Sequence, residues 1–124
     1  MENSNRLFLI VDDSELMREK IKKLLEGSVR IKQVLTSNSY EEAIRLINHQ
    51  QPDVVLLDIN LPYFKNGIDI LRYIKQHFPA IKIIMFTNQA SEYHRDLCLK
   101  LGASHFLDKS KDFDALPGLI NSLN

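Results

Sequence analysis

Five side chains that could do chemistry together stand at the ends of short apolar runs. They are Asp12 and Asp13 after the first run, Asp58 after Val-Val-Leu-Leu, Thr87 at the close of a fourth run and Lys109 after the fifth. Three clustered carboxylates repel one another unless a cation lies among them. Hard oxygen ligands without histidine or cysteine favour Mg²⁺, or Mn²⁺, over Zn²⁺. A metal, a lysine and a hydroxyl around a carboxylate nucleophile are the parts that phosphoryl transfer needs.

Taken singly, each of these residues has a simpler explanation. An Asp-Asp pair is usually a turn or a helix N-cap, a threonine is common in strands, and a loop lysine is usually a solvated charge. Asp58 is more informative, because a carboxylate that closes an apolar strand is costly to bury without a partner. Together, and in this order, the residues predict that Asp58 becomes an acyl phosphate while the metal and Lys109 neutralise the moving phosphoryl oxygens.

The elements that must position these residues follow from a regular alternation. Several of the five runs are continuously apolar and β-branched, which is typical of strands buried on both faces; they span residues 7–11, 31–35, 54–57, 81–86 and 104–107. Helical patterns with one apolar face separate them. A fivefold strand–helix alternation predicts a parallel sheet with helices on both faces. Ligands collect at the carboxyl ends of such strands, so we expect the five side chains to converge.

Glycine and proline mark the helix ends. Gly27 and Gly102 follow helical stretches, where a left-handed C-cap is expected. Pro-Gly at 117–118 falls inside the last helical pattern, although proline is comfortable only in the first turn of a helix. We therefore expect the last helix to begin late, around residue 114, or to be bent.

Composition narrows the function classes. A chain of 124 residues, 44% hydrophobic and 26% charged, predicts one globular domain. Sixteen basic and sixteen acidic residues cancel, so we expect no direct nucleic-acid binding. No apolar run approaches the roughly 18–20 residues of a membrane helix, and the polar N-terminus does not match a secretory signal. The single Cys98 fits a reducing, cytoplasmic compartment and is predicted to be a buried apolar residue.

The ordered motifs resemble the receiver domain of bacterial two-component response regulators. The resemblance rests on Val-Asp-Asp-Ser at 11–14, Leu-Leu-Asp-Ile-Asn-Leu-Pro at 56–62, Phe-Thr at 86–87 and Gly-Ala-Ser-His-Phe-Leu-Asp-Lys at 102–109. It covers a core of about 7–123, so we expect residues 1–124 to be a single receiver domain without an output domain. It implies a flavodoxin-like (βα)5 fold with strand order 2-1-3-4-5 and helices on both faces.

The resemblance also implies a role for each residue of the pocket. Asp58 resembles the phospho-acceptor and Lys109 the lysine that pairs with the phosphate. Asp13 resembles the direct Mg²⁺ ligand, Asp12 helps to hold the metal and its waters, and the backbone carbonyl of Asn60 would be another ligand.

Four residues resemble those that tune and transmit the signal. Thr87 corresponds to the switch hydroxyl, and Phe106 takes the place of the aromatic that swings inward on activation. Asn60 and Gln89 stand two positions after the acceptor and after the switch threonine, where side chains influence the hydrolytic water. Both are amides, which can hydrogen-bond water but supply no charged base.

The implied function is a switch and not an enzyme beyond its own phosphorylation and dephosphorylation. The donor would be a phosphohistidine on a sensor histidine kinase or a histidine phosphotransfer protein, and the output a downstream target protein. Output switch, relay intermediate and phosphate sink all stay open. Two rivals remain: a receiver-fold interaction module that is never phosphorylated, and a Mg²⁺-dependent phosphatase with an Asp nucleophile. Such phosphatases have a second Asp two residues after the nucleophile, where this chain has Asn60.

The chain departs from the usual family pattern at several positions, and two of the departures lie in loops after predicted strands. The loop at 58–67 is one residue longer than usual and is expected to place Tyr63 and Phe64 close to the acceptor. Position 110 is Ser where many relatives have Pro after a cis bond, and a cis bond before Ser110 would cost about 3 kcal/mol.

Overall fold

The computed structural model describes residues 6–27 and 31–123, and the strands within them form one parallel sheet in the order β2-β1-β3-β4-β5. The strands are β1 (Arg6–Val11), β2 (Ile31–Ser37), β3 (Val54–Leu57), β4 (Lys82–Thr87) and β5 (His105–Asp108). Each lies within two residues of its predicted range. The predicted flavodoxin-like fold and strand order are confirmed.

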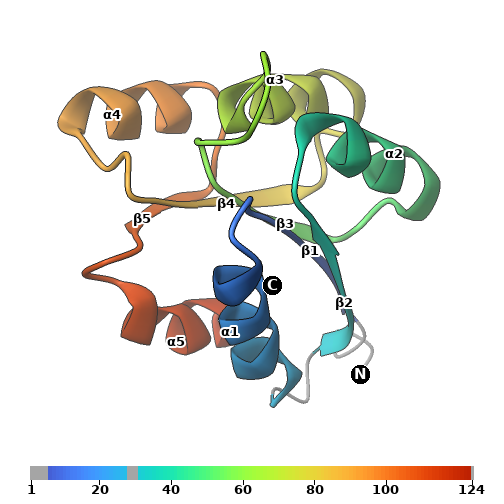
Figure 1. Ribbon diagram of the computed structural model, residues 1–124, viewed down its shortest axis with the longest axis vertical. Helices are drawn as coiled ribbons and strands as arrows, with labels where there is room; N and C mark the ends of the chain where they lie inside the picture. Colours follow the sequence, from blue (N-terminus) through green and yellow to red (C-terminus); the bar gives the residue numbers. More distant parts are fainter. Residues whose placement is uncertain (1–5, 28–30, 124) are drawn as a thin grey trace.

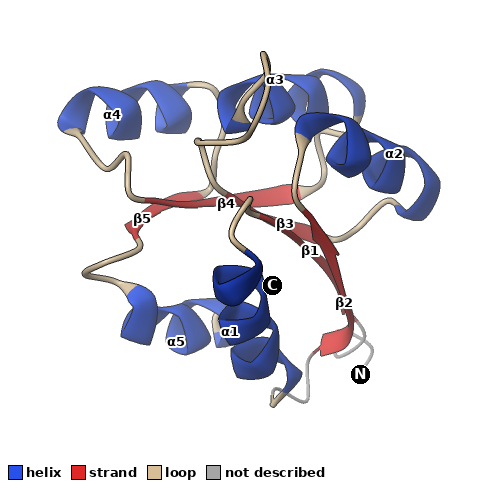
Figure 2. Cartoon of the chain, in the orientation of Figure 1, coloured by secondary structure: helices blue, strands red, loops and turns tan. Residues whose placement is uncertain are grey.

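The helices cover both faces of the sheet (Figures 1 and 2). One face carries α2 (Tyr40–Gln50), α3 (Gly67–His77) and α4 (Glu92–Lys100), and the other carries α1 (Glu15–Glu26) and α5 (Leu116–Asn121). Within residues 6–27 and 31–123, no helix is long and apolar enough to cross a membrane.

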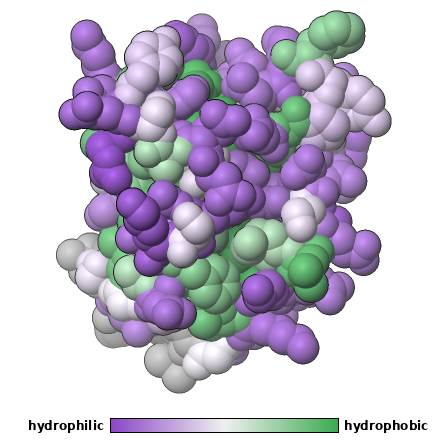
Figure 3. Space-filling view, turned by 60° about the vertical axis from the view of Figure 1, so that its left-hand side comes forward, coloured by the Kyte–Doolittle hydropathy of each residue, from purple (hydrophilic) through white to green (hydrophobic). Residues whose placement is uncertain are grey.

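The core consists of two apolar layers that the sheet separates. Alternate residues of β1 point to opposite layers: Leu9 and Val11 pack with residues of α2 and α3, and Phe8 and Ile10 pack with residues of α1 and α5. The β3 side chains are buried throughout, as expected for a strand covered on both faces. Figure 3 brings the side of α4, β5 and α5 forward and shows a mostly hydrophilic surface above, with apolar patches in its lower half.

The structure confirms the predictions for Gly102 and for the start of the last helix, and it corrects the prediction for Gly27. Gly102 has φ +115°, as predicted for a left-handed residue after a helix. The same prediction for Gly27 is wrong, because Gly27 keeps right-handed dihedrals (φ −77°, ψ −9°) and the chain leaves α1 without reversing hand. The last helix does begin late. A 3-10 turn at Phe113–Ala115 precedes α5, which places Pro117 in the first helical turn, where its missing N–H costs nothing.

Candidate functional site

Two aspartates and a lysine meet in a buried cluster at the carboxyl edge of the sheet. Val11 and Leu57 are register partners in β1 and β3, so the residues that follow them, Asp12 and Asp58, emerge side by side. Lys109 follows β5 and places its Nζ 2.5 Å from Asp12 Oδ2 and 2.8 Å from Asp58 Oδ2. Asp12 and Asp58 are 2% and 5% exposed, and the Lys109 side chain is 8% exposed. The predicted convergence of these three residues is therefore observed.

Asp13 completes a set of carboxylates that fits a hard cation. Oxygens of Asp12, Asp13 and Asp58 lie within 4.8 Å of one another. Asp58 Oδ1 is buried and has no hydrogen-bond partner within residues 6–27 and 31–123. Buried polar atoms normally have a partner, and a divalent ion among these oxygens would supply one. The residues therefore fit the metal that the sequence predicts.

Burial and pairing set the charges of the cluster. Burial raises the pKa of Asp12, although hydrogen bonds from Lys109 and from the Ser14 N–H partly oppose that effect. Burial alone would lower the pKa of Lys109, but its hydrogen bonds and charge interactions with Asp12 and Asp58 outweigh burial and raise it. Lys109 therefore stays protonated and acts as the cation of the metal-free pocket.

Two residues that the sequence analysis did not single out help to build the site. The Arg18 guanidinium donates to the Asp12 backbone carbonyl at 2.8 Å and so fixes the turn between β1 and α1. Gly67 opens α3, donates its N–H to the Ile59 carbonyl at 2.8 Å, and lies so close to Asp58 that a Cβ would stand 1.9 Å from the Asp58 carbonyl oxygen. The sequence holds one signal for each residue. Arg18 is a cation one turn into the first predicted helix, and Gly67 is a lone glycine before an apolar helical pattern.

The predicted switch residues occupy the adjoining core. Thr87 ends β4, is fully buried, and accepts a hydrogen bond from the Gln89 N–H at 3.0 Å through Oγ1. Phe106 is the register partner of Met85 and is buried in the layer beneath α4. The Arg95 guanidinium lies over the Phe106 ring, 5.3 Å from its centroid.

The remaining predicted residues lie as follows. Asn60 and Gln89 are exposed beside the pocket. Cys98 is buried, as predicted, and its burial raises the pKa of the thiol. No peptide bond within the described ranges is cis, so Ser110 follows Lys109 through a trans bond.

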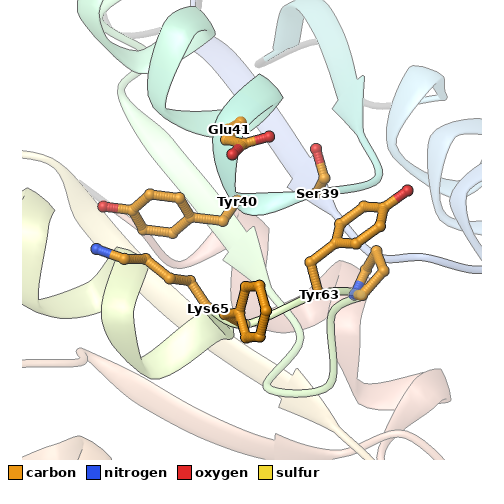
Figure 4. Close-up of a pocket in the computed structure, with 7 residues that line it drawn as sticks. Ser39, Tyr40, Glu41, Tyr63 and Lys65 are labelled. Atoms are coloured by element: carbon orange, nitrogen blue, oxygen red, sulfur yellow. The ribbon is translucent and has the colours of Figure 1, made fainter.

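The loop after β3 carries its aromatic residues outward. Tyr63 has a left-handed backbone (φ +74°), and both Tyr63 and Phe64 are largely exposed. With Pro62 and Lys65 they line a shallow pocket against the start of α2 (Figure 4), where the Lys65 ammonium lies 4.9 Å from the centre of the Tyr40 ring. None of the clustered carboxylates lines this pocket.

We expect Lys109→Met to destabilise the metal-free protein by on the order of 2 kcal/mol, because two buried carboxylates lose their cation. Added Mg²⁺ should recover part of the loss. Acid should also recover part of it, because a carboxyl with a raised folded pKa destabilises the fold above that pKa, and the penalty disappears as pH falls through it. Urea unfolding with and without Mg²⁺ measures both effects. The exposed Lys111→Met is the matched control, and equal stability of the two variants without metal would contradict the prediction.

The comparisons with known proteins agree with this geometry. The family model for the response regulator receiver domain matches residues 8–121. The transcriptional regulatory protein DegU of Brevibacillus brevis is 35% identical over 115 residues, 92% of this chain and 48% of the relative. A protein-glutamate methylesterase/protein-glutamine glutaminase of Treponema pallidum is 38% identical over 112 residues, 88% of this chain and 28% of the relative. The chain thus spans about half or less of the length of these curated relatives.

Solved structures give the same result. A LuxR-family two-component response regulator from Aurantimonas sp. SI85-9A1 superposes with a TM-score of 0.87 at 30% identity, covering 96% of this chain and 84% of that one. The BeF3-activated N-terminal receiver domain of Klebsiella pneumoniae RstA gives a TM-score of 0.83 at 25% identity, covering 93% and 95%. With a family model that matches nearly the whole chain and an acidic pocket at the expected edge, the protein belongs to the response regulator receiver domains, the phosphorylation-dependent signalling domains of two-component systems.

Proposed function

We propose that Asp58 is the residue that accepts the phosphoryl group, with Mg²⁺ held by Asp12, Asp13, Asp58 and the backbone carbonyl of Asn60. The observation that carries the proposal is the unequal environment of the two Asp58 oxygens. Lys109 fixes Oδ2 at 2.8 Å, whereas Oδ1 is buried without a partner. One oxygen is thereby oriented while the other remains available to a metal or a phosphorus atom.

The chemistry follows from this arrangement. An Asp58 oxygen forms a bond to phosphorus while the P–N bond of a phosphohistidine breaks, and the electron pair leaves with the imidazole nitrogen. A bound Mg²⁺ supplies positive charge to the transferred oxygens. Lys109, already protonated and buried, offers a second positive charge beside the same oxygens and needs no large reorganisation to do so.

The proposed partners follow from the family. Receiver domains bind divalent metal ions and interact with histidine kinases and downstream targets. We propose that the phosphohistidine donor is a sensor histidine kinase or a histidine phosphotransfer protein. The output would be contact with a target protein and not with nucleic acid, since sixteen basic and sixteen acidic residues leave no net positive field. The proposed location is the cytoplasm, where a free thiol such as Cys98 persists.

One labelling experiment separates this proposal from its rivals. The protein is incubated with acetyl phosphate and Mg²⁺, and its intact mass is followed before and after treatment with base. One base-labile phosphoryl group per chain is expected. No labelling would favour the interaction module, and many turnovers on an added phosphoester would favour a phosphatase. The Treponema pallidum relative named as a methylesterase matches this chain over only 28% of its length, so its enzyme activity does not carry over.

We propose that Thr87 and Phe106 couple phosphorylation to the surface around α4 and β5. The Thr87 hydroxyl would turn from the Gln89 N–H toward the phosphoryl oxygens. Phe106 is already inside the core, so phosphorylation would raise the population of this inward arrangement. Amide exchange with and without beryllofluoride should show changes that reach residues 91–111. Changes confined to the loops around Asp13 and Asp58 would show that Phe106 does not transmit the signal.

Asn60 and Gln89 are proposed to influence hydrolysis of the acyl phosphate. Both are exposed amides beside the pocket, so they can hold a water but cannot take its proton. Replacing either with leucine should lengthen the phosphorylated lifetime severalfold, less than the roughly hundredfold effect of removing a general base. Decay of the labelled protein measures this, and unchanged decay in both variants would show that these positions are idle.

A further inference from the structure

The loop that follows β5 holds three consecutive backbone N–H groups in fixed directions. The Asp108 N–H donates to Asp112 Oδ2 at 2.9 Å, the Lys109 N–H to the Thr87 carbonyl at 3.1 Å, and the Ser110 N–H to Asp108 Oδ1 at 2.9 Å. The Ser110 hydroxyl donates to the same Asp108 oxygen at 2.7 Å. The Asp112 N–H returns to the Asp108 carbonyl at 2.7 Å, which closes the loop. The peptide unit before Lys109 is therefore held by backbone groups of Thr87 and Asp112, and the unit after it by the Asp108 carboxylate. The Asp112 carboxylate fixes the peptide unit one residue earlier, through the Asp108 N–H.

This bracing bears directly on the position of the lysine nitrogen. A lysine side chain has four rotatable bonds, so its Nζ stays in one place only if the backbone is fixed and the tip has partners. Lys109 has those partners in Asp12 and Asp58, and its side chain is 8% exposed. The hydrogen bonds from Ser110 lower the pKa of Asp108, so that carboxylate remains a charged acceptor near neutral pH.

We infer that Asp112, together with Asp108, is a positioning residue that sets the Lys109 ammonium for contact with the phosphoryl group on Asp58. The inference rests on the proposed function of Asp58 and Lys109. Asp112 touches neither the metal ligands nor Lys109 Nζ in the described hydrogen bonds, and it acts through the Asp108 N–H. Its effect therefore has to appear in how well the pocket binds a phosphoryl-like anion.

The direction of the change in anion affinity shows whether Asp112 positions Lys109 or acts only through its own charge. Removing a carboxylate near an anion site strengthens anion binding through space, because one repulsive charge has gone. Removing a hydrogen bond that positions Lys109 weakens anion binding, because the lysine is no longer held where it contacts the anion. The two explanations thus predict opposite changes for Asp112→Ala. Mg²⁺ binding adds a second distinction, since a less firmly held Lys109 competes less for Asp12 and Asp58 and leaves Mg²⁺ affinity equal or higher.

The experiment measures two affinities by NMR titration of the full chain: beryllofluoride at saturating Mg²⁺, and Mg²⁺ alone. For Asp112→Ala we expect beryllofluoride affinity to fall at least about tenfold while Mg²⁺ affinity stays within about twofold or rises. Asp112→Asn, which removes the charge but keeps an acceptor oxygen, should restore binding. Asp114→Ala removes an exposed carboxylate two residues further on and should behave as wild type.

Each alternative outcome has a distinct meaning. Unchanged beryllofluoride affinity in Asp112→Ala, or a parallel loss of both affinities, would overturn the inference. If Asp112→Ala does not fold, Asp108→Ala is the second test, because the Asp108 carboxylate accepts from the Ser110 N–H and hydroxyl. The inference requires the same result of this variant: weaker beryllofluoride binding with Mg²⁺ affinity kept. Wild-type protein that binds Mg²⁺ but no beryllofluoride would overturn the proposed function itself, and this inference with it.

Discussion

Asp58→Asn is expected to reduce labelling by acetyl phosphate to background. The amide that replaces the carboxylate is a poor nucleophile and a poor Mg²⁺ ligand, so both the proposed attacking oxygen and one proposed metal contact would be lost together. Intact-mass measurement after incubation with acetyl phosphate and Mg²⁺ gives the result directly. The matched control is Asp96→Asn, which changes an exposed carboxylate on α4 and should label as wild type.

Loss of labelling in Asp58→Asn should not reflect unfolding. Lys109 Nζ retains its contact with Asp12 at 2.5 Å, so the variant leaves no unpaired buried cation. It also removes a negative charge from a crowded set of oxygens, which relieves repulsion in the metal-free state. A thermal melt should therefore show a folded variant with stability close to wild type. Undiminished labelling of that folded variant would place the acceptor elsewhere.

The convergence of the pocket could be predicted because it depends on little more than strand order. Parallel strands end at one edge whatever their loops do, so Asp12 and Asp58 had to emerge together once β1 and β3 were neighbours. Burial of Cys98 followed equally from its apolar surroundings. Both results follow from the hydrophobic pattern, which can be recognised in a single sequence.

What could not be predicted depends on the path of the backbone through loops. The sequence predicted repulsion among three carboxylates, whereas the folded chain places Lys109 between two of them. The distance of Lys109 from Asp12 depends on the hydrogen bonds that fix the loop after β5, and no periodic sequence pattern predicts those hydrogen bonds. Gly27 illustrates the same limit, since a glycine after a helix permits a left-handed cap but does not enforce it.

Lys109 consequently changes what metal binding is expected to do. With the lysine as an internal counter-ion, part of the repulsion is already relieved in the metal-free protein. Mg²⁺ is expected to stabilise the fold because it would bind only the folded pocket, but part of that gain would offset the lysine contacts that the ion weakens. The stabilisation by Mg²⁺ should thus be larger in Lys109→Met than in wild type, although that variant starts from a lower stability.

Gly67→Ala is expected to cost the protein more than about 3 kcal/mol, above the usual range for an overpacked site, and to abolish labelling as well. An alanine Cβ at this position would lie 1.9 Å from the Asp58 carbonyl oxygen and 2.9 Å from the Ile59 Cα. Both neighbours are backbone atoms, so no side-chain rotation relieves the contact. The chain must move either the start of α3 or Asp58, which carries the proposed acceptor carboxylate.

Gly118→Ala is the control that shows whether the loss of stability and labelling in Gly67→Ala comes from the steric clash and not from replacing a glycine as such. Gly118 lies in α5, an added Cβ there has no atom within 4 Å, and alanine is favoured over glycine in a helix by about 1 kcal/mol. The control should therefore be as stable as wild type or more stable, and it should label normally. Urea unfolding and acetyl phosphate labelling of the two variants, measured side by side, test the prediction. A Gly67→Ala protein that matches Gly118→Ala in both would mean that the loop from Asp58 to Gly67 is not packed against the acceptor as described.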